Sequence, residues 1–196
     1  MIKMLKEQLN TSALVLIPIA VGINLVGNFA ASTLKLPVFL DLIGTTIAGV
    51  LGGWLVAVAV AIFSAVFQGM FVNPIYFPFM VVGIVNALII GFCAKKGWFD
   101  DIPHSFIPWA LLVIASTITA SFVSIIVFGG ITGATGASVL TATFMAATDS
   151  IIKSVLSSTL IIESIDKLIA VLVAVVVIKK LPNSLRNLNT RVVDDF

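Results

Sequence analysis

The sequence contains very little charge and few residues of the types that carry out chemistry. Charged residues make up 10% of its 196 positions, against roughly 25% in soluble globular domains. There is one histidine and one cysteine, so the chain cannot form an internal disulfide. The formal net charge of +2 is too small to indicate nucleic-acid binding, and we expect no nucleic-acid partner.

Motifs of catalytic and metal sites are also missing from the sequence. It has no HExxH, no GxSxG, no clustered cysteines and histidines, and no Walker-type lysine after its glycine-rich stretch. The single histidine, His104, lies in "KKGWFDDIPHSF", where Asp100 and Asp101 are more simply explained as residues of a solvated loop. We therefore expect a protein that is not an enzyme, with no metal site and no cofactor, and with any ATP hydrolysis carried out by partner subunits.

Long apolar runs dominate the sequence instead. Hydrophobic residues make up 60% of the chain, and the mean hydropathy is +1.20. About 20 apolar residues are enough for a helix to cross a bilayer. The sequence therefore predicts one all-α integral membrane domain over residues 1–196, with a break at Gly52-Gly53. Six transmembrane helices are expected, over residues 12–33, 39–52, 54–72, 78–95, 106–129 and 163–181.

The basic residues predict the orientation of these helices, because cytoplasmic loops of membrane proteins are enriched in lysine and arginine. If the N-terminus is inside, eight of the eleven basic residues fall inside: Lys3, Lys6, Lys95, Lys96, Lys179, Lys180, Arg186 and Arg191. Lys35, Lys153 and Lys167 fall outside. Both termini are therefore expected to be cytoplasmic.

The segment 130–162 is expected to stay outside as a loop or lid. It begins with the glycine-rich "GGITGATGAS" and is long for a plain connection, so a lid or a re-entrant element is predicted. Asp149 and Lys153 are spaced i,i+4, which predicts a helix with a supporting ion pair.

Polar residues are concentrated in the outer halves of the predicted helices. Polar groups within a bilayer are costly unless they find partners, so their placement is informative. The one-sided distribution favours a pocket that is open to the outside and closed below, although single residues can instead face headgroups or bridge helices. The candidate substrate-binding residues are Asn24, Asn28, Asp41, Gln68, Asn73, Tyr76, Phe79, Asn86, Lys153 and Glu163.

Two stretches of this set support a ligand site more directly. Tyr76 and Phe79 lie in "FVNPIYFPFM", where two prolines restrict the backbone. Aromatic rings with amide neighbours suit a flat heteroaromatic ligand, and an outer aromatic belt is the alternative. For Asp41, in "PVFLDLIGTTIAGVLGGW", two roles are open. It caps the N-terminus of the second predicted helix, which we favour, or it binds the ligand.

Small residues recur every four positions through the second and third predicted helices. Such stripes allow helices to approach closely in lipid, either within one chain or against another membrane protein. If the stripe faces a partner, the docking residues are Gly49, Gly53, Ala57, Ala61 and Ala65.

Four stretches cover most of residues 37–182 in order: "FLDLIGTTIAGVLGGWLVAVAVA", "NPIYFPF" followed by "GIVNALIIGFCAKKGWF", "GGITGATGAS" and "ESIDKLIAVLVAVVVIKKLP". In their order and spacing they resemble the substrate-binding S component of energy-coupling factor (ECF) vitamin transporters. The resemblance implies six helices in a bacterial cell membrane and an outward-facing vitamin pocket capped by loops. It also implies docking to a transmembrane T component that is driven by two ATPase subunits.

One departure from the family pattern concerns docking. Family members often carry an Ala-xxx-Ala pair on the first helix, whereas this chain has Ala20-xxx-Asn24 there. Ala20 therefore remains a docking candidate, and the stripe that begins at Gly49 is expected to share the role.

The residue types also narrow the substrate. Every arginine lies in the C-terminal tail, so the predicted pocket has no bidentate clamp for a substrate carboxylate. This weighs against folate, biotin and pantothenate, although Lys153 or Lys167 can bind an anion as a point charge. We expect a small neutral heteroaromatic, either hydroxymethylpyrimidine or a B6 vitamer such as pyridoxine. The alternatives are another vitamin, such as pantothenate or riboflavin, or a membrane-embedded sensor domain.

Overall fold

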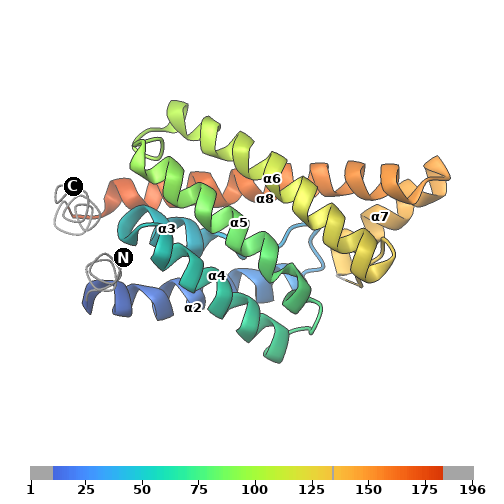
Figure 1. Cartoon of the computed structure of the whole chain (residues 1–196), viewed down its shortest axis with the longest axis horizontal. Coiled ribbons are helices and arrows are strands. Elements are labelled where there is room, and N and C mark those ends of the chain that lie inside the picture. Colours follow the sequence, from blue (N-terminus) through green and yellow to red (C-terminus); the bar gives the residue numbers. More distant parts are fainter. Residues whose placement is uncertain (1–10, 134, 183–196) are drawn as a thin grey trace.

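The computed structural model describes residues 11–133 and 135–182, and all regular secondary structure within them is helical. Most of the helices run broadly along one axis, and the start of α2 lies at the same end of the bundle as the end of α8 (Figure 1). The helices are α2 (Thr11–Thr33), α3 (Ile43–Gly52), α4 (Trp54–Phe71), α5 (Tyr76–Lys95), α6 (Ile102–Phe128), α7 (Thr135–Thr148) and α8 (Ile151–Lys180).

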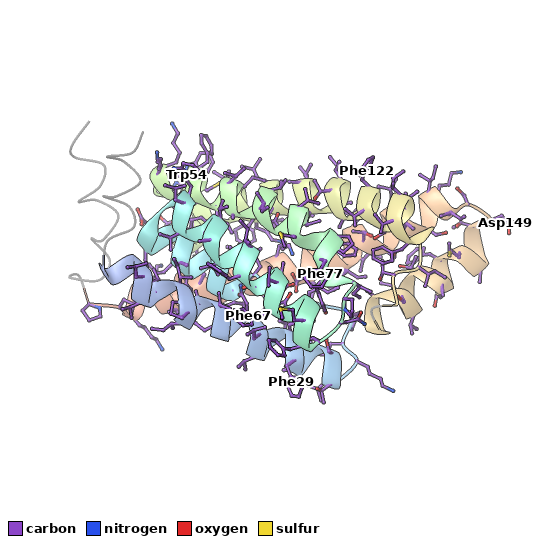
Figure 2. All side chains as sticks on the ribbon, turned by 60° about the horizontal axis from the view of Figure 1, so that its bottom comes forward. Phe29, Trp54, Phe67, Phe77, Phe122 and Asp149 are labelled. Atoms are coloured by element: carbon purple, nitrogen blue, oxygen red, sulfur yellow. The ribbon has the colours of Figure 1, made fainter. Side chains whose placement is uncertain are left out.

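Four of these helices are long and apolar enough to cross a membrane: α2, α4, α5 and α6. Their bounds lie within four residues of the predicted spans 12–33, 54–72, 78–95 and 106–129. Large apolar side chains such as Phe29 and Phe122 project from the surface of the bundle (Figure 2), where they are 65% and 66% exposed. A soluble protein rarely exposes so much apolar surface, so the chain has the character of a membrane protein.

The two remaining predicted spans do not correspond to helices that are both long enough and apolar enough to cross a membrane. Helix α3 has ten residues and is therefore about 15 Å long, roughly half the thickness of the hydrocarbon core. Helix α8 has thirty residues and begins twelve residues before the predicted start at 163. Its apolar character is interrupted by Glu163, Asp166 and Lys167, all of which are buried. The prediction of six full spans is thus confirmed for four.

The segment 130–162 is mostly helical. It contains α7 and the first turns of α8, which pack against each other as a hairpin. Asp149 lies between the two helices with a φ of 48°, outside either helix, and Ser150 is the residue that caps α8. The prediction that Asp149 and Lys153 lie in one helix and form an ion pair is therefore wrong. Helix α8 starts after Asp149, and no ion pair joins the two side chains.

The predicted break between α3 and α4 is confirmed at Gly53. This residue has a φ of 83°, a conformation that side chains with a Cβ rarely adopt. Its backbone N–H donates to the carbonyl of Gly49 at 3.0 Å, which ends α3, and α4 begins at Trp54. The short helix α3 and the longer helix α4 therefore meet at a tight turn.

The small-residue stripe packs inside the chain. A Cβ on Gly49 would lie 2.6 Å from Ile90 of α5, which shows how closely α3 and α5 approach. Because a buried residue cannot present a surface to another protein, the prediction that this stripe is a docking face is wrong. The six candidates that share this burial are Ala20, Gly49, Gly53, Ala57, Ala61 and Ala65.

The basic residues are only partly placed as expected. Lys95 and Lys96 end α5, and Lys179 and Lys180 end α8, whereas Lys167 is buried in the middle of α8 and not in an exposed outer position. The predicted inner residues Lys3, Lys6, Arg186 and Arg191 lie outside the described residues.

A close contact between α4 and α5 depends on Gly91. A Cβ at this position would clash with the Cβ of Trp54 and would lie 2.6 Å from the Trp54 Cα, which is backbone and cannot move aside. We expect Gly91→Ala to lower the free energy of unfolding by about 1–3 kcal/mol, the usual cost of overpacking. Thermal unfolding in detergent checks this, with Gly22→Ala as the control.

Gly22 is the matched control because no heavy atom lies within 4 Å of the Cβ it would carry. Alanine is also a better helix former than glycine by roughly 1 kcal/mol, so Gly22→Ala should leave stability unchanged or raise it. Equal losses of stability in the two variants would contradict the proposed α4–α5 contact.

Candidate functional site

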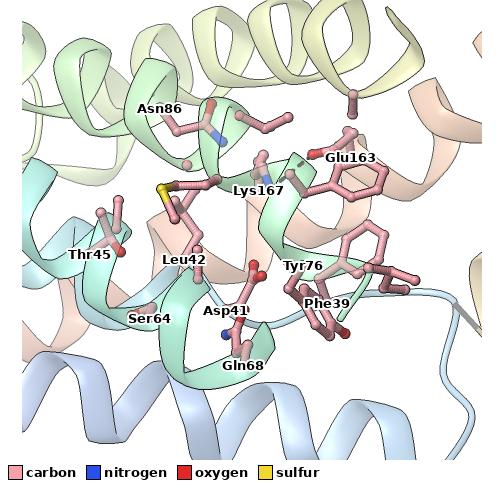
Figure 3. Close-up of a pocket in the computed structure, with 18 of the residues that line it drawn as sticks. Phe39, Asp41, Leu42, Thr45, Ser64, Gln68, Tyr76, Asn86, Glu163 and Lys167 are labelled. Carbon is pink, nitrogen blue, oxygen red and sulfur yellow. Dashed lines mark ion pairs between the residues drawn. The ribbon is translucent and has the colours of Figure 1, made fainter. Parts of the chain in front are cut away.

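The main candidate site is a cavity between α3, α4, α5, α6 and α8, with the segment before α3 as one wall (Figure 3). It measures about 740 Å³ out to its open mouth. Its polar lining residues are Asp41, Thr45, Ser64, Gln68, Tyr76, Asn86, Thr132, Glu163 and Lys167, and its apolar ones include Phe39, Leu42, Phe79 and Met80. Polar groups on an otherwise apolar wall are typical of small-molecule sites.

Asp166 of α8 holds the segment that leads into α3. Its Oδ1 accepts hydrogen bonds from the backbone N–H groups of Phe39, at 2.9 Å, and Leu40, at 2.7 Å. Leu40 has a φ of 53°, so this backbone adopts a conformation that L-residues disfavour. The two hydrogen bonds thus fix the position from which Phe39 and Asp41 reach the cavity.

Asn24 of α2 completes the N-terminus of α3. Its Oδ1 accepts from the Gly44 N–H at 2.7 Å, and its Nδ2 donates to Thr45 Oγ1 at 2.8 Å and Ser64 Oγ at 3.0 Å. The side chain is fully buried and does not line the cavity. Asn24 therefore joins α2, α3 and α4, and its amide is not available to a ligand.

Asp41 lines the cavity and does not cap α3. Leu42 occupies the N-cap position, and its side chain makes no capping hydrogen bond. The orphan N–H of Gly44 is instead satisfied from α2, by Asn24. The favoured prediction that Asp41 is a helix cap is therefore wrong, and the carboxylate faces the cavity (Figure 3).

Three charged residues of α8 form a buried cluster beside the cavity. Lys167 Nζ lies 2.9 Å from Glu163 Oε2 and 2.9 Å from Asp166 Oδ2, and its side chain is 4% exposed. Burying one of these charges alone would be costly, so the pairing explains how all three stay inside the bundle. Lys167 is thereby committed to carboxylates of its own chain, which argues against the expectation that it binds an anionic substrate.

Helices α4 and α5 supply amide and aromatic groups to the same cavity. Gln68 is 2% exposed, and its Nε2 has no hydrogen-bond partner. Asn86 accepts a hydrogen bond from Ser116 Oγ at 2.8 Å. Phe79 lines the wall and stacks on Phe128 with ring centroids 5.8 Å apart. A donor that is buried without a partner is the kind of group that a ligand can satisfy.

The other predicted residues either support the wall of this cavity or lie away from it. Asn28 supports the wall, because its Nδ2 donates to the hydroxyl of the lining residue Tyr76 at 2.8 Å. Asn73 accepts from the Ile75 N–H at 3.1 Å and lines a second cavity of about 590 Å³ beyond Tyr76. Lys153 is exposed on α8 and lines neither cavity, so its predicted role in substrate binding is wrong.

The structure thus gathers six of the ten predicted residues around one cavity: Asp41, Gln68, Tyr76, Phe79, Asn86 and Glu163. The list of candidate residues did not include Phe39, Thr45 and Ser64, and Lys167 was considered only as a point charge for an anion. Lys167 carries a detectable signal, because Glu163 at i−4 predicts a helical ion pair. Phe39 has no such signal, since its position depends on a hydrogen bond to a residue of α8.

Asp101 and His104 form a helix cap at the start of α6. The Oδ1 of Asp101 accepts from the His104 backbone N–H at 2.9 Å and lies 2.8 Å from the ring Nδ1. The backbone hydrogen bond, followed by the one from the ring, holds the pKa of the Asp101 carboxyl below its ordinary value. Capping accounts for this exposed pair.

With this geometry established, the chain was compared with known proteins. It matches no family model, no curated protein and no solved structure.

Proposed function

We propose that this chain is the vitamin-binding S component of an ECF-type importer in a bacterial cell membrane. In this role it binds a small heteroaromatic vitamin or precursor, hydroxymethylpyrimidine or pyridoxine. It delivers the vitamin to a transmembrane T component that works with two ATPase subunits. The proposal takes its partners from the resemblance of the sequence and its ligand from the chemistry of the cavity.

The observation that carries the proposal is the composition of the cavity wall. Rings of Phe39, Tyr76 and Phe79 stand next to the amides of Gln68 and Asn86 in one enclosed space. Aromatic rings favour offset or edge contacts with a flat ligand, and amides supply both donors and acceptors at its edge. A site of this type holds a molecule by shape and hydrogen bonds, as a subunit that captures and hands over its substrate requires.

The orientation follows from the direction of α5. Its first turn, with Tyr76 and Phe79, lines the cavity, and its last turn ends at Lys95. Lysines at the ends of α5 and α8 favour the cytoplasmic side for that end of the bundle. The cavity would then open towards the outside of the cell, with both termini in the cytoplasm.

The test is to purify the chain in mild detergent from cells grown with a vitamin mixture and to identify bound small molecules by mass spectrometry. We expect hydroxymethylpyrimidine or a B6 vitamer in near-stoichiometric amount. Gln68→Met, which removes the unpartnered amide, should purify with less ligand, whereas Phe122→Leu on the exposed face of α6 should retain it. Another vitamin would keep the S-component proposal and correct its substrate, and a protein that is always empty would contradict the proposal.

A further inference from the structure

The groups around the cavity carry more negative than positive charge. Three carboxylates lie at or beside its wall, those of Asp41, Glu163 and Asp166. Within the part of the chain that the structure describes, Lys167 is the one basic residue that lines this cavity. If all four groups are ionised, the site has an excess of two negative charges inside an apolar bundle, where uncompensated charge is costly.

The single lysine is already shared by two of the carboxylates. Lys167 Nζ lies 2.9 Å from an oxygen of Glu163 and 2.9 Å from an oxygen of Asp166. The other oxygen of Asp166 accepts two backbone N–H groups, at 2.9 and 2.7 Å. Asp166 is therefore fully engaged by groups of the chain itself, whereas Glu163 Oε2 makes the ion pair with Lys167 but no hydrogen bond.

Asp41 is the carboxylate that remains without an ion pair. It forms no ion pair with Lys167, and its side chain lines the cavity. The side chains that face it across the cavity are Tyr76 from α5 and the α8 cluster, and Gln68 lines the same space from α4 (Figure 3). Lys167 is the one cation among these side chains, and its direct ion pairs are with Glu163 and Asp166 and not with Asp41.

The uncharged part of the wall is also compatible with a cation. Phe39, Tyr76 and Phe79 place three aromatic rings in the lining, and the faces of such rings attract positive charge. The Nε2 of Gln68 is a donor without a hydrogen-bond partner, so it would pair with an acceptor atom on a different part of the ligand from the one that meets Asp41. A neutral ring could hydrogen-bond to Gln68 but would leave the negative charge of Asp41 uncompensated, whereas a protonated ring would also balance that charge.

We infer that the ligand is bound as a cation, a nitrogen heterocycle whose protonated ring nitrogen donates to Asp41 and whose acceptor meets the Gln68 amide. This inference rests on the proposed function, and it replaces the neutral heteroaromatic expected from the sequence by its conjugate acid. It also assigns Asp41 as the residue that determines ligand specificity, whereas the charged cluster of α8 maintains the structure of the site.

The test compares each ligand with an analogue whose ring is not readily protonated. Hydroxymethylpyrimidine is paired with its 4-oxo counterpart, and pyridoxine with the analogue in which a C–H replaces the ring nitrogen. Binding is measured by calorimetry on the full chain in detergent. We expect the wild type to prefer the basic member of a pair by about 30-fold, in the range for a hydrogen bond to a charged group. Asp41→Ala should reduce this preference to within about threefold.

Asp149→Ala is the matched control, because it removes an exposed carboxylate between α7 and α8 and should leave the preference unchanged. If Asp41→Ala does not purify, Asp41→Asn removes the charge while keeping the shape of the side chain. Equal binding of both members by the wild type, or a preference that survives in the Asp41 variants, would overturn the inference. So would a co-purified vitamin that has no basic ring nitrogen, although the proposed function would then stand. Binding of no vitamin at all would overturn both.

Discussion

Lys167→Met is expected to lower the free energy of unfolding by about 3–5 kcal/mol, the cost of leaving buried charge without its partner. The substitution preserves much of the volume of the side chain but removes the ammonium that lies 2.9 Å from both Glu163 and Asp166. Two carboxylates would then remain buried beside each other. Unfolding in a denaturing detergent, followed by circular dichroism, measures the loss.

Two further variants separate lost charge from lost packing. Lys153→Met changes an exposed lysine of the same helix and should change stability by less than about 0.5 kcal/mol. Combining Lys167→Met with Glu163→Gln and Asp166→Asn leaves the cluster uncharged and should recover most of the stability, since neutral replacements of buried ion pairs are often tolerated. A triple variant as unstable as Lys167→Met alone would show that packing, and not charge, explains the effect.

Asn24→Ala is expected to lower the free energy of unfolding by about 2–4 kcal/mol. The variant removes three buried hydrogen bonds that join α2 to α3 and α4, and it leaves the Gly44 N–H without an acceptor. A typical buried hydrogen bond contributes about 1 kcal/mol, somewhat less between helices in lipid, and an unsatisfied buried N–H adds roughly 1–3 kcal/mol. Thermal unfolding in detergent is the measurement.

Asn73→Ala provides the comparison. Asn73 accepts one local hydrogen bond, from the Ile75 N–H in the turn before α5, so its loss should cost about 1 kcal/mol or less. If Asn24→Ala is as stable as Asn73→Ala, Asn24 does not hold the three helices together in the way described, and its amide would again be a candidate for ligand binding.

Local patterns in the sequence were sufficient for most of the fold. Apolar length gave α2, α4, α5 and α6, and the Gly52-Gly53 pair marked the turn where Gly53 needs a positive φ. Length alone could not show that α8 extends back to Ile151, because its first turns carry serines and a lysine among their apolar residues. These turns are stabilised by packing against α7, which is a tertiary effect.

The site was less predictable, because polar residue types do not reveal their partners. Asn24 and Gln68 look equivalent in the sequence, yet the amide of Asn24 is used entirely by α3 and α4, whereas Gln68 Nε2 has no partner. Asp41 has the position of a helix cap, but α3 starts one residue too late and takes its cap from α2. Only the folded arrangement of the helices distinguishes a structural amide or carboxylate from one that faces the cavity.

The hydrogen bonds from Phe39 and Leu40 to Asp166 also set an order of events during biosynthesis. They join positions 127 and 126 residues apart, so a ribosome synthesises the wall of the cavity long before it reaches the residue that fixes it. At typical rates of translation the interval is roughly 6–25 s. During this interval α3 to α7 are synthesised, while the backbone N–H groups of Phe39 and Leu40 still lack the Asp166 acceptor. The wall of the cavity is therefore complete only once α8 has joined the other helices.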